Sequence, residues 1–145
     1  MTYYSPFDMV GTFKNGIRCE DITNLTFEND KFDLIVSSDV LEHVHNIEQA
    51  FRESARVLKK GGIHLFTVPI HDGLTFKRCE FVNDELHHIV EPEYHYDPLN
   101  KNGCIVFWTF GTDITDYFIN EAFKIDIVSG PQGIDKRYLL ALKKI

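Results

Sequence analysis

The chain has 145 residues, of which 43% are hydrophobic and 26% charged, so it has the size and composition of one globular domain with its own core. Its formal net charge of −7 argues against a nucleic-acid backbone as the main partner, because such binding depends on Lys and Arg. No stretch approaches the ~20 apolar residues of a membrane span, and the first residues lack the pattern of a signal peptide. The three cysteines have no C-x-x-C spacing, which favours a reduced, cytoplasmic setting.

The first part of the chain gives a weak structural signal. Residues 1–16 are aromatic and interrupted by glycines, and they show no period that predicts a regular element. Ile17–Ile22 has the composition of a short strand that ends in Glu20 and Asp21. Residues 23–31 are rich in turn-forming residues, so we expect a connector there.

Residues 32–69 have the pattern of a strand, a helix and a second strand, which is the smallest parallel βαβ unit. Leu34–Val36 is a short apolar run, typical of a buried strand. From Ile47 onward, small or apolar residues recur at helical spacing, and Asn46 can cap the helix. The pattern predicts a helix that runs through Lys59 and Lys60 to a left-handed Gly61, and then a strand over His64–Val68.

Polar residues follow both strands of this unit. Because parallel crossovers are right-handed, both strands should end at the same edge of the sheet, and ligands of open α/β sheets bind at that edge. The residues concerned are Ser37, Ser38, Asp39, Glu42, His43 and His45 after the first strand, and His71 and Asp72 after the second. The sequence therefore predicts that the functional residues lie at this edge of the sheet.

The middle segment, residues 70–110, shows little periodicity, and Asn83–Val90 has the pattern of a short helix or a turn. A long irregular segment in a compact domain is typically a lid or a substrate loop. Its histidines and one acid could gather a metal, but their spacings match no compact motif, so the sequence predicts no metal site. The candidate ligands are His71, Asp72, His87, His88 and His95.

The pattern becomes clear again in the C-terminal part. Thr112 or Asp113 can cap a helix that extends to about Ala122. Phe123–Ile127 alternates apolar and polar residues, and Tyr138–Leu142 is a second apolar strand after a turn rich in glycine. We expect these two strands to be antiparallel neighbours.

Three motifs together resemble a known family. They are Asp21–Phe27 (DITNLTF), Phe32–Val44 (FDLIVSSDVLEHV) and Arg52–Pro69 (RESARVLKKGGIHLFTVP). In this order and spacing they are similar to the later motifs of class I S-adenosylmethionine-dependent methyltransferases, closest to the small-molecule branch often called methyltransferase type 11. The resemblance implies a Rossmann-like α/β fold with a mixed sheet and a C-terminal antiparallel strand pair.

The resemblance also implies roles for individual residues. It places Asp21 and Ile22 at the adenine of S-adenosylmethionine, and Ser38 and Asp39 at the methionine end of that cofactor. It places His43 where the family faces a small-molecule substrate. The segment 92–98 resembles a loop that covers the active site in one subgroup, which adds the candidates Tyr94, His95 and Asp97. Methyl transfer to oxygen or nitrogen needs a base, and His43 or His95 suits that task. The structural alternatives are an ordinary turn acid at Asp21 and a histidine satisfied at a helix start at His43.

The chain also departs from the family pattern. The family opens with a strand and a G-x-G-x-G loop, which nothing in residues 1–145 matches, so we expect one truncated methyltransferase-like domain corresponding to the C-terminal two thirds of the fold. We expect the short strand near Cys19 to lie beside Leu34–Val36, or a second chain to cover that edge in a homodimer.

Three functions stay open at this point. The first is a methyltransferase that acts on a small molecule. The second is an inactive methyltransferase-like binding or regulatory module. The third is a fragment completed by a partner chain.

Overall fold

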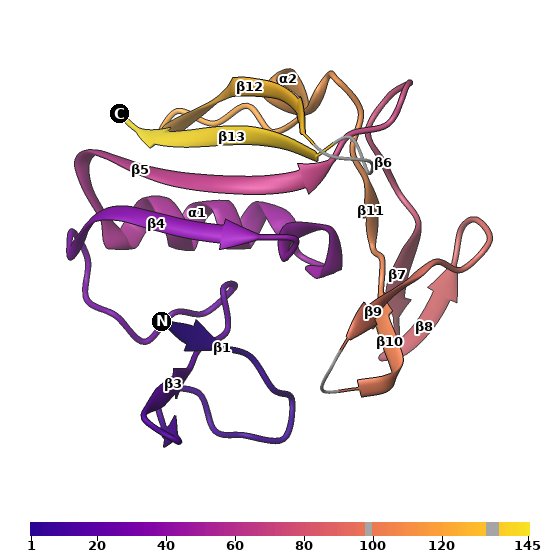
Figure 1. The fold of residues 1–145 in the computed structure, drawn as a ribbon, viewed down its shortest axis with the longest axis horizontal. Helices are drawn as coiled ribbons and strands as arrows, with labels where there is room; N and C mark the ends of the chain where they lie inside the picture. Colours follow the sequence, from indigo (N-terminus) through magenta and orange to yellow (C-terminus); the bar gives the residue numbers. More distant parts are fainter. Residues whose placement is uncertain (98–99, 133–136) are drawn as a thin grey trace.

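The computed structural model describes residues 1–97, 100–132 and 137–145, and its centre is a four-stranded mixed sheet. The strand order is β12 (Phe123–Gln132), β13 (Arg137–Lys144), β5 (Leu58–Pro69), β4 (Phe32–Ser38). β4 runs parallel to β5, whereas β13 is antiparallel to both β5 and β12 (Figure 1). The predicted α/β fold, with a mixed sheet and a C-terminal antiparallel pair, is confirmed.

The helix of the βαβ unit begins as predicted but ends earlier. α1 spans Ile47–Val57, and the Asn46 side chain accepts a hydrogen bond from the Gln49 backbone at 3.2 Å. Leu58 already has extended backbone angles, because it pairs with Phe32 of β4 and starts β5. The predicted helix end at Gly61 is therefore wrong. The positive φ of Gly61, 76°, lies inside β5, where the pairing with β4 shifts register.

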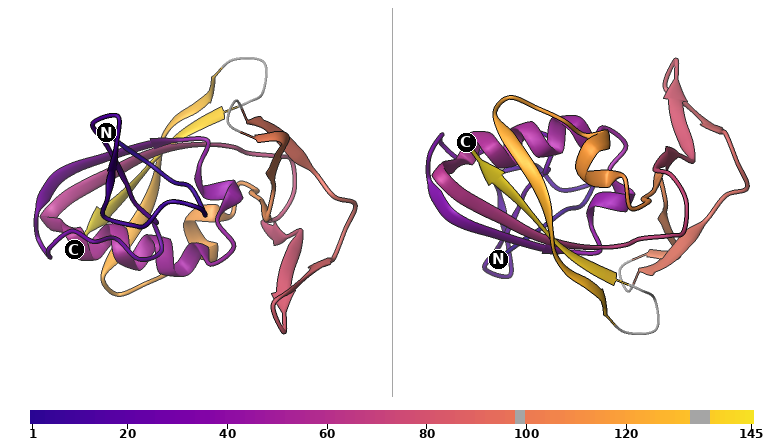
Figure 2. Two further views of the ribbon diagram at one scale, coloured as in Figure 1. Left: turned by 90° about the horizontal axis from the view of Figure 1, so that it is seen from below. Right: turned by 90° about the horizontal axis from the view of Figure 1, so that it is seen from above.

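Both helices pack on the same face of the sheet (Figure 2). Phe51 of α1 is fully buried, and its ring centroid lies 5.8 Å from that of Phe66 and 5.3 Å from that of Phe118. α2 spans only Ile114–Tyr117, so the predicted extension to Ala122 is wrong. Phe118 leaves the helical conformation and turns its ring into the core, which ends the helix. No helix in the described ranges is long and apolar enough to cross a membrane.

The opposite face and the outer edge of β4 are open. Residues that pair across neighbouring strands point to the same face of the sheet. Leu34 and Val36 do not pair with the buried His64 of β5, so their side chains point to the face opposite to His64. Leu34 is 53% exposed and Val36 is 68% exposed, so the strand is present as predicted but its predicted burial is wrong. Within the described ranges, β4 pairs with β5 alone. This edge is the part of the sheet that remains available for pairing.

A small separate sheet holds the N-terminal residues (Figure 1). β3 (Ile17–Cys19) pairs in parallel with β1 (Thr2–Tyr3) and antiparallel with β2 (Phe13–Lys14). The prediction that the strand near Cys19 lies beside Leu34–Val36 is therefore wrong. Both edges of β3 are occupied by its own neighbours in sequence, so it has no edge left for β4.

The middle segment is not irregular, as the sequence suggested, but a series of short strands beside the main sheet (Figure 1). Asn83 and Asp84 both have positive φ, 51° and 64°, which is the backbone of the tight turn between two hairpin strands. The strands are β6 (Phe76–Lys77), β7 (Cys79–Val82), β8 (Glu85–His88), β9 (Tyr94–Asp97), β10 (Asn100–Ile105) and β11 (Trp108–Thr109).

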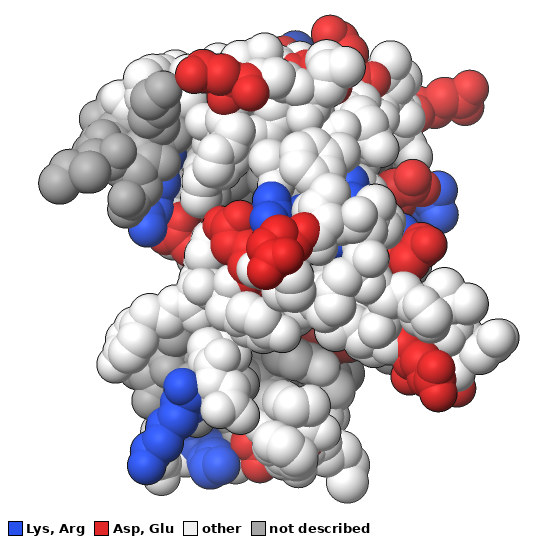
Figure 3. Space-filling model, turned by 90° about the vertical axis from the view of Figure 1, so that its right-hand side faces the viewer, with Lys and Arg blue, Asp and Glu red and all other residues white. Residues whose placement is uncertain are grey.

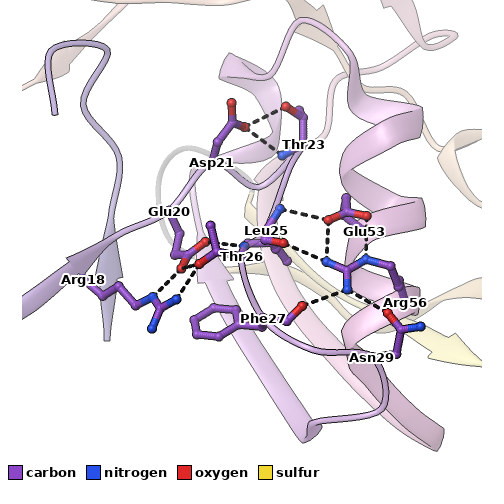
Figure 4. Close-up of polar contacts among 10 residues, drawn as sticks. All are labelled: Arg18, Glu20, Asp21, Thr23, Leu25, Thr26, Phe27, Asn29, Glu53 and Arg56. Carbon is purple, nitrogen blue, oxygen red and sulfur yellow. Dashed lines mark hydrogen bonds and ion pairs between the residues drawn. The ribbon is translucent and has the colours of Figure 1, made fainter. Parts of the chain in front are cut away.

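The connector between the two sheets is tied to α1 by one arginine (Figure 4). The Arg56 guanidinium donates to both carboxylate oxygens of Glu53 at 2.7 Å, to the carbonyl oxygens of Leu25 and Phe27 at 2.8 Å, and to the Asn29 side chain at 2.8 Å. Glu53 in turn accepts from the backbone N–H of Leu25 at 2.8 Å. In the described part of the chain, Leu25, Phe27 and Asn29 belong to no strand, so these contacts hold the connector backbone in place.

A second acid holds the other end of the connector (Figure 4). Glu20 is 4% exposed, and its carboxylate accepts from the Arg18 guanidinium at 2.5 Å and from the Thr26 backbone N–H at 2.8 Å. Together the two networks fix the course of the chain from β3 to β4.

Candidate functional site

The carboxyl end of β4 forms a turn with an unusual backbone. Asp39 has a φ of 52°, in the left-handed region that only a few residue types other than glycine adopt readily. Its backbone N–H donates to the Thr67 carbonyl at 3.1 Å, and the Ser38 hydroxyl lies 2.8 Å from the Thr67 hydroxyl. The Asp39 carboxylate accepts from Arg137 Nε at 2.7 Å. Residues from three strands thus fix this turn at the edge where ligands of α/β sheets bind.

Asp21 and Ile22 lie at the start of the connector. One Asp21 oxygen accepts from both the backbone N–H of Thr23 at 2.8 Å and the Thr23 hydroxyl at 2.7 Å (Figure 4). Asp21 therefore has the hydrogen bonds of an ordinary turn acid, which is the alternative to a role in cofactor binding. Ile22 is partly buried and packs against the main core. A role of either residue at the adenine remains a prediction.

A carboxylate and two imidazoles meet just beyond the Asp39 turn. Glu42 and His43 belong to η1 (Leu41–His43), a single 3₁₀ turn, and His95 comes from β9. The His95 Nδ1 atom lies 3.9 Å from Glu42 Oε1, and the His43 and His95 rings pack edge to face with centroids 4.9 Å apart. One ligand atom from each residue lies within 4.8 Å of those of the other two. Two of the predicted catalytic residues are thus brought together.

Glu42 is the member of this group whose role sequence reasoning missed. Glu42 is 1% exposed, and neither of its carboxylate oxygens has a hydrogen-bond partner among the described residues. Burial raises the pKa of Glu42 to about 7, and the neighbouring charge of Asp39 acts in the same direction. The sequence signal was available, because an acid between apolar Leu41 and Val44 at a functional edge is a candidate buried carboxyl.

Contacts from the segment 105–108 hold η1 against the hairpin β9–β10. The His43 Nδ1 atom lies 2.7 Å from the Ile105 carbonyl oxygen, and the Phe107 N–H donates to the Glu42 carbonyl at 2.8 Å. The Trp108 indole N–H donates to the Val44 carbonyl at 3.0 Å. A small cavity of about 10 Å³, room for one water molecule or ion, lies beside the cluster. Its lining residues are Glu42, Pro69, His71, Glu93, His95, Val106, Trp108 and Thr109.

The remaining predicted residues are dispersed. His87 and His88 are exposed on β8, so they do not join His95. His71 lines the same cavity as His95. Asp97 ends β9, and its side chain lies outside the described part of the structure. The structure therefore groups Glu42, His43 and His95, a set that no sequence spacing predicted.

The side of the molecule formed by the hairpins carries acidic side chains near its centre (Figure 3). Glu93, next to β9, lies 3.2 Å from His95 Nε2 and forms an ion pair with Arg78 at 3.3 Å, which partly balances its charge.

The fold and part of the sequence match known proteins. The family "Methyltransferase domain" matches residues 8–66, which include the connector, β4, α1 and most of β5. No curated protein matches the sequence. These 59 residues contain both the Asp21 turn and the Asp39 turn.

Solved structures of other proteins share the fold. An S-adenosylmethionine-dependent methyltransferase from Thermotoga maritima has a TM-score of 0.55 and 17% identity, over 89% of this chain and 64% of that one. One from Mesorhizobium loti has a TM-score of 0.54 and 19% identity, over 92% and 72%. A 1,6-didemethyltoxoflavin-N1-methyltransferase from Burkholderia thailandensis has a TM-score of 0.55 and 14% identity, over 89% and 51%.

These matches confirm the predicted resemblance to class I S-adenosylmethionine-dependent methyltransferases. The fold is the Rossmann-like fold of that class, and residues 8–66 carry the sequence pattern of its methyltransferase domain. The chain spans 64% of the Thermotoga protein and 51% of the Burkholderia protein, so it is shorter than either.

Proposed function

We propose that this chain binds S-adenosylmethionine at the carboxyl edge of β4 and β5 and takes part in methyl transfer to a small molecule. The observation that carries the proposal is the fixed Ser38–Asp39 turn at that edge, followed directly by the Glu42–His43–His95 group. The Burkholderia neighbour, which was solved with S-adenosylhomocysteine and a small substrate bound, supports this class of ligand.

Methyl transfer requires the protein to position the two reactants and to supply a base. An acceptor oxygen or nitrogen forms a bond to the methyl carbon, the bond between that carbon and the sulfonium breaks, and the sulfur leaves as a thioether. Orientation in line supplies most of the acceleration, and the acceptor's proton must be removed. We propose that His43 or His95 is the base that accepts this proton, with Asp97 of β9 as a further candidate. Asp21 and Ile22 are the proposed adenine wall, and Ser38 and Asp39 the proposed wall for the methionine end.

Calorimetric titration with S-adenosylhomocysteine tests this proposal. We expect heat of binding at millimolar ligand or below, which corresponds to a free energy of about −4 kcal/mol or better. Replacing Ser38, which is exposed at the carboxyl end of β4, with leucine should weaken binding at least about tenfold by filling the site.

Asp33→Leu provides the matched control. Asp33 is an exposed residue near the opposite end of the same strand, so this change should leave the affinity unaltered. Absence of heat at millimolar ligand with the wild-type chain would rule out cofactor binding by this chain alone, and would favour an inactive binding or regulatory module.

The open edge of β4 favours a second candidate, a site completed by another chain in a homodimer. Leu34 and Val36 expose apolar side chains at a strand whose outer edge has no partner within the described ranges. We expect light scattering during size-exclusion chromatography to give the mass of a dimer. Val36→Lys, which puts a charge on this edge, should shift the mass to that of a monomer. A wild-type chain that runs as a monomer at every concentration would contradict this candidate.

A further inference from the structure

Glu42 is a buried acid whose charge needs a partner. The residue is 1% exposed, and neither of its carboxylate oxygens accepts a hydrogen bond from a described residue. Folded proteins rarely leave a buried carboxylate in this condition, because removing its charge from water is costly unless hydrogen-bond donors or an opposite charge replace the water. A donor that enters the adjoining cavity would satisfy these oxygens.

The cavity beside Glu42 has the size of one small donor group and a lining without cations. Its volume is about 10 Å³, which is room for a single water-sized group. The titratable side chains that line it are those of Glu42, Glu93, His71 and His95, and no Lys or Arg among the described residues lines it. Glu93 already has an ion pair with Arg78 at 3.3 Å. Glu42 is therefore the acid whose charge a ligand in the cavity would balance.

His95 presents a second acceptor to the same cavity. Its Nε2 atom lies 3.2 Å from Glu93 Oε1, and a carboxylate accepts, so the proton of the neutral ring is on Nε2 and the lone pair on Nδ1. The Nδ1 atom lies 3.9 Å from Glu42 Oε1, which is too far for a direct hydrogen bond. Two acceptors that share one donor nitrogen lie roughly 4–5 Å apart, so a single donor nitrogen fits between these two atoms.

Charge favours a cation over a water molecule as this donor. Water can bridge the two acceptors, but it leaves the buried charge of Glu42 unbalanced. An ammonium group offers up to three N–H donors and carries the opposite charge, and hydrogen bonds between charged partners are the stronger kind. Burial raises the pKa of Glu42 to about 7, whereas Asp39 and Arg137 in the neighbouring turn act on it in opposite directions. A bound cation would offset the effect of burial and keep Glu42 ionised.

The cavity adjoins the edge of the sheet at which the cofactor is proposed to bind. Pro69 is the last residue of β5, and both Pro69 and His71 line the cavity. Because His71 is exposed, the rest of a ligand whose charged end occupies the cavity can extend to the surface on that side. The small volume leaves no room for several methyl groups on the nitrogen, so the ammonium group must carry N–H bonds.

We propose that this cavity binds the ammonium group of a small primary amine, with the Glu42 carboxylate and His95 Nδ1 as its acceptors. Binding of the amine needs no cofactor, whereas its role as the methyl acceptor rests on the proposed function. In methyl transfer, one N–H proton passes to His95 Nδ1, and the nitrogen lone pair then bonds to the methyl carbon as the sulfur leaves. His95 returns its proton to water. Glu42 balances the positive charge of the amine before the step and that of the methylated product after it.

Trp108 provides a reporter for this site. It is the one tryptophan of the chain, and its ring lines the cavity. Its indole N–H therefore gives a single, identifiable peak in a proton–nitrogen correlation spectrum. When the full chain is titrated with propylammonium chloride at constant ionic strength, we expect this peak to shift and to saturate in the millimolar range. Tighter binding is not expected, because each non-hydrogen atom of a ligand contributes a limited free energy.

Two control ligands test the charge and the N–H donors on the wild-type chain. Propanol has nearly the shape of propylammonium but no charge, and tetramethylammonium has the charge but no N–H and is larger. Neither should shift the indole peak as propylammonium does. Equal responses to propylammonium and propanol, or no saturable response to propylammonium, would overturn the proposal and leave a water molecule as the occupant.

Matched variants test the two acceptors. Glu42→Gln removes the charge at nearly constant shape, and His95→Ala removes the second acceptor, so each should weaken binding of propylammonium at least about tenfold. Glu85→Gln removes an exposed acid on β8 and should leave the affinity unchanged. The spectrum of each variant without ligand shows whether its fold is retained. Wild-type affinity in a folded Glu42→Gln variant would contradict the site.

Titration with S-adenosylhomocysteine in the absence of amine tests the proposed function separately. Binding of propylammonium without binding of S-adenosylhomocysteine would support the ammonium site and reject the cofactor site. The reverse result would reject the ammonium site alone, so the two failures are distinguishable.

Discussion

Replacing Arg56 with alanine is expected to lower the free energy of unfolding by about 3 kcal/mol. The change removes hydrogen bonds to Glu53, Leu25, Phe27 and Asn29 at once. It leaves the Glu53 carboxylate, whose pKa Arg56 holds below its usual range, in a largely buried position without its cation. Urea denaturation followed by circular dichroism measures the loss.

The same helix provides a matched control. Arg52 lies one turn earlier and is largely exposed, and its ion pair in the described part of the chain is with the exposed Glu48 at 3.4 Å within its own helix. Arg52→Ala should therefore change the free energy of unfolding by less than about 0.5 kcal/mol. Arg56→Lys keeps the charge but not the fork of donors, so it should lose most of the same stability. Equal stabilities of the Arg52→Ala and Arg56→Ala variants would contradict the role of this network.

His64 is expected to make the fold less stable in acid. It is fully buried in β5, where its Nε2 atom lies 2.8 Å from the Ser37 hydroxyl, and desolvation lowers its pKa to about 4. The unfolded chain takes up a proton here near pH 6.5, whereas the folded chain resists it until about pH 4. Between these values stability falls as the pH falls, by an amount on the order of 3 kcal/mol from this group.

A pH series of urea denaturation curves measures this contribution. His64→Leu removes the titration, so its free energy of unfolding should fall less steeply than that of the wild type from pH 6.5 to pH 4. His87→Gln changes an exposed histidine and should keep the wild-type slope. Identical slopes in the wild type and in His64→Leu would show that the buried ring does not determine how the free energy of unfolding changes in this pH range.

The parts of the fold that could be predicted are those in which local pattern and packing agree. The apolar run Leu34–Val36, the Asn46 cap and the stripe around Phe51 all describe the same βαβ unit, and the structure contains it. The C-terminal strand pair was predicted for the same reason. Each strand there shows its own period, and the turn between them is rich in glycine.

The incorrect predictions concern elements whose ends are determined by contacts between residues distant in the sequence. Leu58 pairs with Phe32, and this pairing ends α1 before the local stop signal at Gly61 is reached. Phe118 ends α2 because its ring has a place in the core, which no local pattern reports. In the middle segment, strands as short as Phe76–Lys77 do not establish a period, so the sequence showed no sheet there.

The site was predicted in part. The polar edge after β4 and the importance of His43 followed from the sequence, and His95 entered through the resemblance to a family loop. Their meeting with Glu42 depends on the contacts of the segment 105–108 with η1, which link residues 62 and 64 positions apart. Such distances cannot be read from spacing. The proposed roles of Asp21, Ile22, Ser38 and Asp39 at a cofactor remain predictions.

The acceptor of the His43 hydrogen bond is a main-chain atom. The Ile105 carbonyl oxygen is present whatever side chain stands at position 105, so most substitutions there leave the partner of His43 Nδ1 in place. The side chains of Glu42 and Glu93, by contrast, can each be lost by a single change. The hydrogen bond that orients His43 should therefore tolerate substitution better than the side-chain contacts of this group.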